Sequence, residues 1–229
     1  MKEYKYLLFD ADNTIFDFNC SEQEALYLTF SSYGIELTDE EHDVYHDIND
    51  TLWKQLEKGE VTRDKLKIMR FSQFIEYLGR EDLVPEEISS LYVEMLSRQS
   101  FLIDGALDVC RELSGSYPLY LITNGITSVQ VRRFDSSPVK AYFKKIFISE
   151  EMGVAKPSPE YFLKVADEIG DTDRSHYLVI GDSLSSDIKG AVNFGCDSVW
   201  VAPKGSVSDL PTYTVNSLSN IFDILSARG

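Results

Sequence analysis

The spacing of hydrophobic and polar positions divides the chain into two kinds of sequence. From about residue 18 to residue 99, apolar positions recur every three or four residues, which is typical of amphipathic helices. Glycines stand at positions 34, 59 and 79, where a chain can leave a helix in the left-handed conformation. We therefore expect an all-helical segment with helices at residues 21–33, 39–58, 63–78 and 86–98.

The starts of these helices carry recognisable signals. Ser21 with Glu24, and Thr38 with Glu41, have the spacing of capping boxes, in which two side chains satisfy the first free amides of a helix. Pro85 stands where the last of the four helices would accept a proline in its first turn.

Beyond residue 100 the pattern alternates between short apolar runs and helical stretches. Together with residues 6–10, the apolar runs predict strands at residues 119–123, 146–148, 177–181, 198–201 and 213–215. Helices are expected near residues 105–114, 127–135, 159–169 and 185–194, and after residue 217. Such alternation implies a parallel sheet with helices on both faces. The predicted fold class is α/β, with a doubly wound, Rossmann-like core of residues 1–17 and 100–229 and a helical insert of residues 18–99.

Composition narrows the classes of partner. The 229 residues include 22 Lys and Arg against 38 Asp and Glu, a formal net charge of −16. A chain of this charge repels a nucleic-acid backbone, so we expect no nucleic acid polymer as a partner. A small anionic molecule is still allowed, because a metal ion and a few aimed donors dominate the potential inside one cleft.

Cysteine usage and hydropathy bear on the compartment. The three cysteines, at positions 20, 110 and 196, lie far apart and form no CxxC pair, which favours a reducing environment. The apolar run at residues 6–9 is too short for a signal peptide, and no later run approaches 18 apolar residues. We expect a cytoplasmic protein without a membrane partner.

Polar residues follow the predicted strands where an α/β sheet forms its ligand crevice. Asp10 and Asp12 come at the end of the first strand, two residues apart, so that both carboxylates face one point. Thr123 ends the second sheet strand, and Lys156 follows the third. Asp182 closes the fourth strand, with Asp187 five residues further on.

Each of these signals has an ordinary structural explanation when taken alone. Asp and Asn are common turn formers, and a single Lys is usually a surface charge. Asn124-Gly125 is also a hairpin signal, but Thr127 through Gln130 has the spacing of a capping box, which favours a helix over a return strand. It is the placement of all these residues at the ends of different strands that indicates a site.

The order and spacing of these motifs resemble the four motifs of the haloacid dehalogenase superfamily, across nearly all of the chain outside the insert. The resemblance implies a magnesium-dependent phosphatase in which Asp10 is a nucleophile that forms an aspartyl phosphate and Asp12 is a general acid and base. It implies that Thr123, Asn124 and Lys156 bind the phosphate. Mg²⁺ would be held by the carboxylates of Asp10 and Asp182 and the backbone carbonyl of Asp12, with Asp187 in the outer shell.

Several alternatives stay open at this point. Dehalogenation is disfavoured, because the dehalogenase branch is not expected to keep an acid at the position of Asp12. A phosphomutase would share every core residue, and a phosphatase for another metabolite such as a sugar phosphate would fit as well. A receiver-like signalling domain has no large helical insert, and a catalytically dead binding relative would be expected to lack at least one of the four main site residues. Asn13 departs from the glycine that many relatives have there.

The helical insert is expected to be a cap that chooses the substrate. The run from Asn49 to Trp53 together with Arg70, and the Asp12 to Phe16 start, resembles bacterial pyrimidine nucleoside 5′-monophosphatases of this superfamily. These relatives act on dUMP, UMP, dTMP and modified pyrimidine nucleotides. Asn49, Trp53 and Arg70 are accordingly candidate selectivity residues, because an aromatic ring stacks on a base and the polar groups bond its edge or the sugar. The alternative is that Trp53 belongs to the packing of the insert.

Overall fold

A computed structural model describes residues 3–226 and resolves them into two compact units. The segment Asn19–Gln99 forms the helical unit, and the described residues before and after it form the α/β unit. The α/β unit is built on a six-stranded, all-parallel sheet with strand order β3-β2-β1-β4-β5-β6. Its strands are β1 (Tyr6–Asp10), β2 (Leu119–Thr123), β3 (Phe143–Ile148), β4 (Tyr177–Gly181), β5 (Asp197–Val201) and β6 (Tyr213–Val215).

The first strand of the chain lies in the middle of this sheet. Strand β1 pairs with β2 on one side and with β4 on the other, so the winding direction reverses between β1 and β4. In a doubly wound sheet the ligand crevice opens beyond the carboxyl ends of the strands at that reversal. Asp10 is the last residue of β1, and Gly181 is the last residue of β4.

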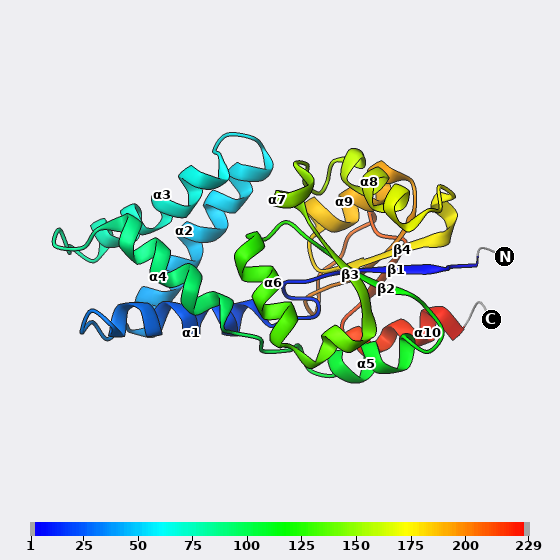
Figure 1. The fold of residues 1–229 in the computed structure, drawn as a ribbon, viewed down its shortest axis with the longest axis horizontal. Helices are drawn as coiled ribbons and strands as arrows, with labels where there is room; N and C mark the ends of the chain where they lie inside the picture. The colour runs from blue at the N-terminus through cyan, green and yellow to red at the C-terminus, as the bar shows by residue number, and fades with distance from the viewer. Residues whose placement is uncertain (1–2, 227–229) are drawn as a thin grey trace. The chain divides into compact units, whose positions relative to one another are not determined.

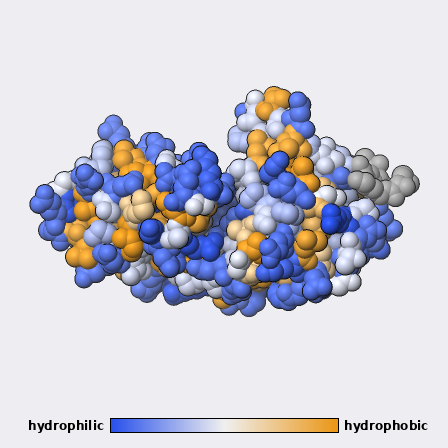
Figure 2. Space-filling model, turned by 90° about the horizontal axis from the view of Figure 1, so that it is seen from above, coloured by the Kyte–Doolittle hydropathy of each residue, from blue (hydrophilic) through white to orange (hydrophobic). Residues whose placement is uncertain are grey.

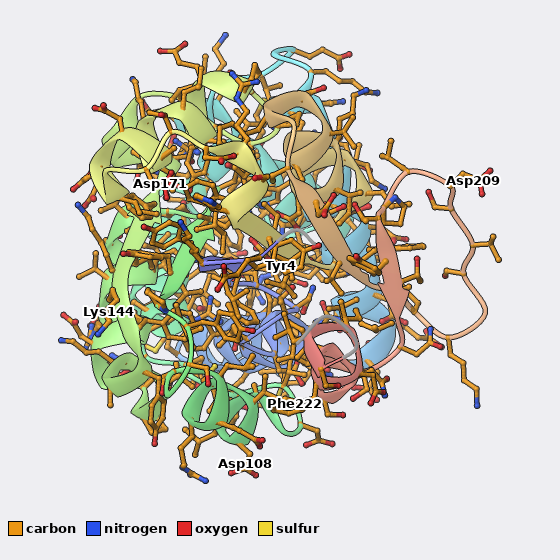
Figure 3. All side chains as sticks on the ribbon, turned by 90° about the vertical axis from the view of Figure 1, so that its right-hand side faces the viewer. Tyr4, Asp108, Lys144, Asp171, Asp209 and Phe222 are labelled. Atoms are coloured by element: carbon orange, nitrogen blue, oxygen red, sulfur yellow. The ribbon has the colours of Figure 1, made fainter. Side chains whose placement is uncertain are left out.

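Alternate residues of the strands build two hydrophobic cores, one on each face of the sheet. Leu7 and Phe9 belong to the core beneath α5 (Ala106–Leu113), α6 (Thr127–Ser136) and α10 (Ile221–Ser226), while Leu8 belongs to the core beneath α8 (Pro159–Ile169) and α9 (Lys189–Phe194). Figure 1 shows these helices on the two sides of the sheet. Viewed from the right-hand side of Figure 1, Asp108 of α5 and Phe222 of α10 lie on one side of the sheet and Asp171 lies on the other (Figure 3). The α/β class with helices on both faces is confirmed.

The helical unit contains α1 (Phe18–Ser31), α2 (Asp39–Glu57), α3 (Arg63–Tyr77) and α4 (Pro85–Ser97). Thr38 and Glu41 form the expected capping box, and Pro85 is the first residue of α4. Gly34, Gly59 and Gly79 follow the first three helices with φ of 71°, 74° and 63°, so the glycine signals mark the helix ends correctly. The unit packs around a group of buried aromatic rings in edge and stacked contacts: Phe30, Tyr45, Phe71, Phe74 and Tyr92.

Several local predictions differ from the structure. Helix α1 begins at Phe18 and not at residue 21, and the side chain of Asn13 accepts a hydrogen bond from the Phe18 amide (3.1 Å) at its start. The capping box expected for Ser21 and Glu24 is therefore wrong, because both residues lie within the helix. Strand β3 begins at Phe143, and the exposed Lys144 and Lys145 hide its start from a hydrophobicity pattern. The helix expected at residues 185–194 is a π-helical turn, Leu184–Ile188, followed by α9.

Short elements complete the α/β unit. They are α7 (Ser149–Met152) and the 3₁₀ turns Pro138–Tyr142, Arg174–His176 and Leu218–Asn220. The loop with Asp209, between β5 and β6, extends away from the sheet (Figure 3). The visible surface is mainly hydrophilic, with hydrophobic side chains in separate groups (Figure 2). Among residues 3–226, each helix lacks the length of apolar sequence that crossing a bilayer requires.

Candidate active site

Asp10 and Lys156 form a buried ion pair at the carboxyl end of β1. Asp10 is 7% exposed and Lys156 is 3% exposed. The ammonium of Lys156 donates to Oδ1 of Asp10, to Oδ1 of Asp187 (2.6 Å) and to the carbonyl oxygen of Ile122 (3.2 Å). Three donors thus meet three acceptors, and the lysine side chain is fixed in the crevice between β1 and β2.

Three carboxylates share this crevice. Asp10, Asp182 and Asp187 each offer an oxygen atom, and these atoms lie within 4.8 Å of one another. Burial, and then repulsion from Asp187, raise the pKa of Asp10 well above its usual value and the pKa of Asp182 to about 7. Burial alone would lower the pKa of Lys156, but attraction to Asp10 and Asp187 raises it. One ammonium beside three carboxylates leaves room for a further cation, and buried carboxylate oxygens are the ligands that Mg²⁺ prefers.

Asp187 is held by the turn in which it lies. Its Oδ2 accepts a hydrogen bond from the amide of Ser183 (3.1 Å), while its Oδ1 accepts from Lys156. A Cβ on Gly181 would lie 2.3 Å from Oδ2 of Asp187, so only glycine at the end of β4 lets the carboxylate sit there. Both oxygens are engaged with the protein, which suits a residue that contacts a metal through water more than one that binds it directly.

The loop after β2 is tied to the loop that carries Lys156. The amide nitrogen of the Asn124 side chain donates to the carbonyl of Lys156 (2.8 Å), and its oxygen accepts from the Lys156 amide (3.0 Å). The Asn124 side chain therefore orients the lysine. Thr123 uses its hydroxyl oxygen to accept from the Gly125 amide (2.9 Å), which keeps the hydroxyl proton available for a phosphate oxygen.

Tyr161 supports this loop from below and was not anticipated from the sequence. Its buried hydroxyl accepts from the amide of Thr123 (3.2 Å) and donates to the carbonyl of Phe147 (2.8 Å). It thereby satisfies one backbone group at the end of β2 and one in β3. A tyrosine in an amphipathic helix carries no sequence signal for such a role.

Asp12 is held by two side chains of α6. Its Oδ1 accepts from Nη1 of Arg133 (2.6 Å), and its Oδ2 accepts from Nε2 of Gln130 (2.6 Å). The capping box expected between Thr127 and Gln130 is therefore wrong. The side-chain amide of Gln130 bonds Asp12, and the backbone amide of Thr127 donates to Glu150 (2.7 Å). A signal was present: two polar residues, Gln130 and Arg133, interrupt the buried stripe of α6, whose other members are Val129 and Phe134.

The departure at Asn13 is explained by its backbone. Asn13 has φ of 56°, in the left-handed region. Glycine adopts this region without steric cost, and asparagine adopts it more readily than most other residues. Its amide donates to the carbonyl of Phe16 (2.7 Å). Asparagine thus keeps the loop conformation that glycine would adopt.

The candidate selectivity residues lie in the helical unit. Asn49 donates to Oε1 of Glu22 (2.7 Å) and accepts from Arg70 (3.3 Å), and all three side chains are buried. His46 contacts the other oxygen of Glu22 at 2.5 Å. Arg70 also packs over the rings of Phe71 and Tyr92, with 5.0 and 4.6 Å from its guanidinium carbon to the ring centres.

Trp53 differs from these residues, since its side chain is partly exposed. The structure thus places Asn49 and Arg70 in a polar network inside the helical unit and leaves part of the Trp53 ring at the surface of that unit.

Comparison with known proteins agrees with the geometry. Residues 4–195 match the family model described as haloacid dehalogenase-like hydrolase. The chain belongs to this family. Family membership and full-length nucleotidase relatives together support an enzyme that hydrolyses phosphoric monoesters.

Three bacterial relatives span essentially the whole chain. The HAD-hydrolase YfnB of Bacillus subtilis is 39% identical, covering 99% of this chain and 97% of its own, and its crystal structure, described as bound to magnesium, superposes with a TM-score of 0.92 over 97% of this chain and 99% of that one. The pyrimidine 5′-nucleotidase PynA of Streptococcus pneumoniae is 34% identical, covering 97% of this chain and 95% of its own. The pyrimidine 5′-nucleotidase YjjG of Escherichia coli is 30% identical, covering 97% and 98%.

Proposed function

We propose that the protein is a magnesium-dependent phosphomonoesterase that works through an aspartyl phosphate and acts on pyrimidine nucleoside 5′-monophosphates. One observation carries the proposal: the buried carboxylate of Asp10 lies at the centre of the crevice, bonded to Lys156 and within 4.8 Å of oxygens from Asp182 and Asp187. The residues proposed as nucleophile, as phosphate-binding cation and as the surroundings of a metal ion thus lie close together.

In the first half of the reaction, an oxygen of Asp10 attacks the phosphorus of the substrate. The bond between phosphorus and the ester oxygen breaks, and Asp12 supplies the proton that this leaving oxygen needs. Lys156 and the hydroxyl of Thr123 hold the oxygens of the transferring group, together with amides of the loop after β2. Asn124 contributes by fixing Lys156.

In the second half, water attacks the phosphorus of the aspartyl phosphate. Asp12 removes a proton from that water, the bond between phosphorus and Asp10 breaks, and inorganic phosphate leaves. The residues that hold the phosphoryl group serve both halves, because the same oxygens carry the charge in each transition state.

The charge in the crevice explains the need for a metal. A phosphate dianion beside three carboxylates is strongly repelled, and Lys156 offsets only one of these charges. Bound Mg²⁺ supplies two further positive charges and polarises the phosphoryl oxygens. Asp10 and Asp182 would hold it through their carboxylates and Asp12 through its backbone carbonyl, with Asp187 in the outer shell. The oxygen-only donor set fits this ion.

The choice of a pyrimidine nucleotide rests on the resemblance of the helical unit and on the names of two full-length relatives, PynA and YjjG. Trp53, Asn49 and Arg70 are the residues we propose for selectivity, with Trp53 foremost because its ring is partly exposed. We also propose a cytoplasmic location, where nucleotide substrates occur.

A substrate panel with purified protein tests the proposal. With Mg²⁺, dUMP, UMP and dTMP should be hydrolysed faster than AMP, GMP and hexose phosphates, and rapid acid quenching should trap radioactive phosphate on the wild-type chain but not on Asp10→Asn. Equal rates for purines and pyrimidines would remove the nucleotide preference and leave the phosphatase. A hexose phosphate preferred over every nucleotide would favour the sugar phosphatase, and isomerised phosphate ester with little free phosphate would favour the mutase.

A further inference from the structure

Both oxygens of the Asp12 carboxylate are occupied by donors from a single helix. Arg133 Nη1 and Gln130 Nε2 each lie 2.6 Å from one of the two oxygens. Gln130 and Arg133 are three residues apart on α6, so their side chains leave the same face of the helix. A carboxylate held at both oxygens cannot rotate freely, and its direction is set by the position of α6.

The two donors are part of the interior of the α/β unit. Arg133 is fully buried and Gln130 is 2% exposed. The guanidinium of Arg133 packs over the ring of Phe16, 4.8 Å from its centre, and the ring of Phe18 lies 6.0 Å away. A buried arginine is costly without a carboxylate partner. The segment from the end of β1 to the first residue of α1 therefore supplies both the partner, Asp12, and the two rings that lie beside the guanidinium.

The loop after β2 is shaped around the Gln130 amide. A Cβ built on Gly125 would lie 2.2 Å from Nε2 of Gln130, and the three atoms nearest to it all belong to that side chain. Any larger residue at position 125 would displace the amide from Asp12. The glycine thus supports the same arrangement from a third segment of the chain.

We propose that Gln130 and Arg133 are positioning residues that aim the Asp12 carboxylate at the leaving oxygen of the substrate and then at the attacking water. This inference rests on the proposed role of Asp12. Proton transfer is efficient only when donor and acceptor are aligned within hydrogen-bond distance. Loss of either donor lets the carboxylate turn and removes part of the acid and base catalysis, while Asp10 and Lys156 keep their places.

The leaving group makes the proposal testable. An alkyl ester such as a nucleotide needs a proton on its leaving oxygen, whereas p-nitrophenolate leaves without one. The quantity kcat/KM covers the steps up to formation of the aspartyl phosphate, and kcat also includes its hydrolysis. Poor alignment of Asp12 should therefore lower kcat/KM for the alkyl ester much more than for p-nitrophenyl phosphate, and should lower kcat for both.

The experiment compares Gln130→Met, Arg133→Met and Arg133→Lys with the wild-type enzyme on its best alkyl phosphate and on p-nitrophenyl phosphate. We expect kcat/KM for the alkyl ester to fall about 10- to 100-fold in the two Met variants, part of the general acid contribution, and that for p-nitrophenyl phosphate to change less than about threefold. Arg133→Lys should recover part of the loss. Arg132→Met is the matched control, because Arg132 is exposed on the same helix.

Gly125→Ala gives a second route that does not remove either donor. It should reproduce the leaving-group dependence of Gln130→Ala. In the Gln130→Ala background it should add less than about twofold, because the three atoms nearest to the new Cβ are then absent. Additive losses in this cycle would contradict the proposal, even if Arg133→Met does not fold.

Asp12→Ala separates the acid and base role of Asp12 from the positioning role of Gln130 and Arg133. If Asp12→Ala itself shows no leaving-group dependence, the acid and base role fails and the proposed mechanism with it. If Asp12→Ala shows the dependence but kcat/KM of the Gln130 and Arg133 variants falls by the same factor on both esters, or does not fall, only the positioning role is overturned.

Discussion

Asn124 and Lys156 are joined by two hydrogen bonds, from the Asn124 side-chain amide to the Lys156 carbonyl (2.8 Å) and from the Lys156 amide to the Asn124 side-chain oxygen (3.0 Å). The loops after β2 and β3 are thereby locked together beside the buried ammonium. The Asn124 side chain, which the family resemblance assigns to phosphate binding, thus also fixes the backbone of Lys156.

Asn124→Ala should accordingly lower both activity and stability. We expect a loss of about 10- to 100-fold in kcat/KM from displacement of Lys156, and about 1–3 kcal/mol of unfolding free energy from unpaired buried backbone groups. Kinetics and urea denaturation measure the two effects. Asn193→Ala is a suitable control, because the exposed Asn193 bonds the neighbouring Pro157 carbonyl (2.9 Å) from outside the site. Equal effects of both variants would contradict the assignment.

Replacing Asp10 and Asp12 one at a time should separate their proposed roles. Asp10→Asn should abolish turnover, because an amide cannot form the phosphoenzyme, while the fold persists. Asp12→Ala should lose about 10²- to 10⁴-fold on an alkyl phosphate, the usual contribution of a positioned general acid. Steady-state rates with magnesium present decide the matter, and near-normal turnover by Asp10→Asn would end the covalent mechanism.

Activity should require Mg²⁺, and the affinity for Mg²⁺ should fall as the pH falls. EDTA should abolish activity, Mg²⁺ should restore it, and Ca²⁺ should fail because its longer and looser coordination misplaces the nucleophile. Burial and the nearby Asp187 raise the pKa of Asp182 to about 7, so below that pH a proton competes with the metal for this ligand. Calorimetric titration should find Mg²⁺ affinity weakening as pH falls from about 8 to about 6.

The same raised pKa values predict the stability of the metal-free protein. Carboxyl groups that hold protons more tightly when folded contribute stability at low pH and lose it as pH rises through their folded pKa. The metal-free protein should therefore lose stability as pH rises from the usual carboxyl range towards about 7, and the rise in Tm on adding Mg²⁺ should grow over the same interval. A rise in Tm that is constant with pH would contradict this view of the site.

His46 should make the helical unit more stable at low pH. The hydrogen bond to Glu22 raises the pKa of His46, with Asp50 and Asp47 adding to the effect. A histidine with a raised folded pKa stabilises the protein below its unfolded pKa, near 6.5, and this contribution is lost as pH rises through the folded value. Because the side chain is 42% exposed, the effect should stay below about 1 kcal/mol.

Thermal melts of the wild type and His46→Gln at a series of pH values test this prediction. The two curves should converge as pH rises through the raised pKa of His46, and the wild type should gain more on acidification. An unchanged profile in His46→Gln would rule out the contribution.

Trp53→Ala should show whether the Trp53 ring contacts the substrate base or only packs within the helical unit. If its partly exposed ring stacks on a base, Trp53→Ala should lower kcat/KM for UMP or dUMP about 5- to 150-fold and leave p-nitrophenyl phosphate within a few-fold. Leu52→Ala is the matched core control, since Leu52 is 1% exposed, and it should cost about 2–5 kcal/mol and lower both rates together. Equal losses on both substrates with a lower Tm would assign Trp53 to packing.

Sequence periodicity was sufficient to predict the α/β class, because the strands and the helices each produce a simple pattern of apolar positions. Residues 6–10, 119–123 and 177–181 are apolar runs that coincide with β1, β2 and β4, because strands covered on both faces need hydrophobic side chains on both sides. Polar residues at the ends of such strands, Asp10 and Thr123 among them, stand out against that background. The family resemblance could therefore be recognised from local sequence alone.

What the sequence could not determine is which polar groups pair with one another. Gln130 lies 118 residues from Asp12 along the chain, and Asn124 lies 32 residues from Lys156, so their hydrogen bonds exist only because the sheet brings the loops together. The capping signal at Thr127 and Gln130 failed for the same reason: the side-chain amide of Gln130 bonds the charged carboxylate of Asp12, which is a stronger partner than the backbone at the start of its own helix. Local sequence thus determined the elements and indicated the candidate site residues, whereas tertiary packing decided how those residues are held.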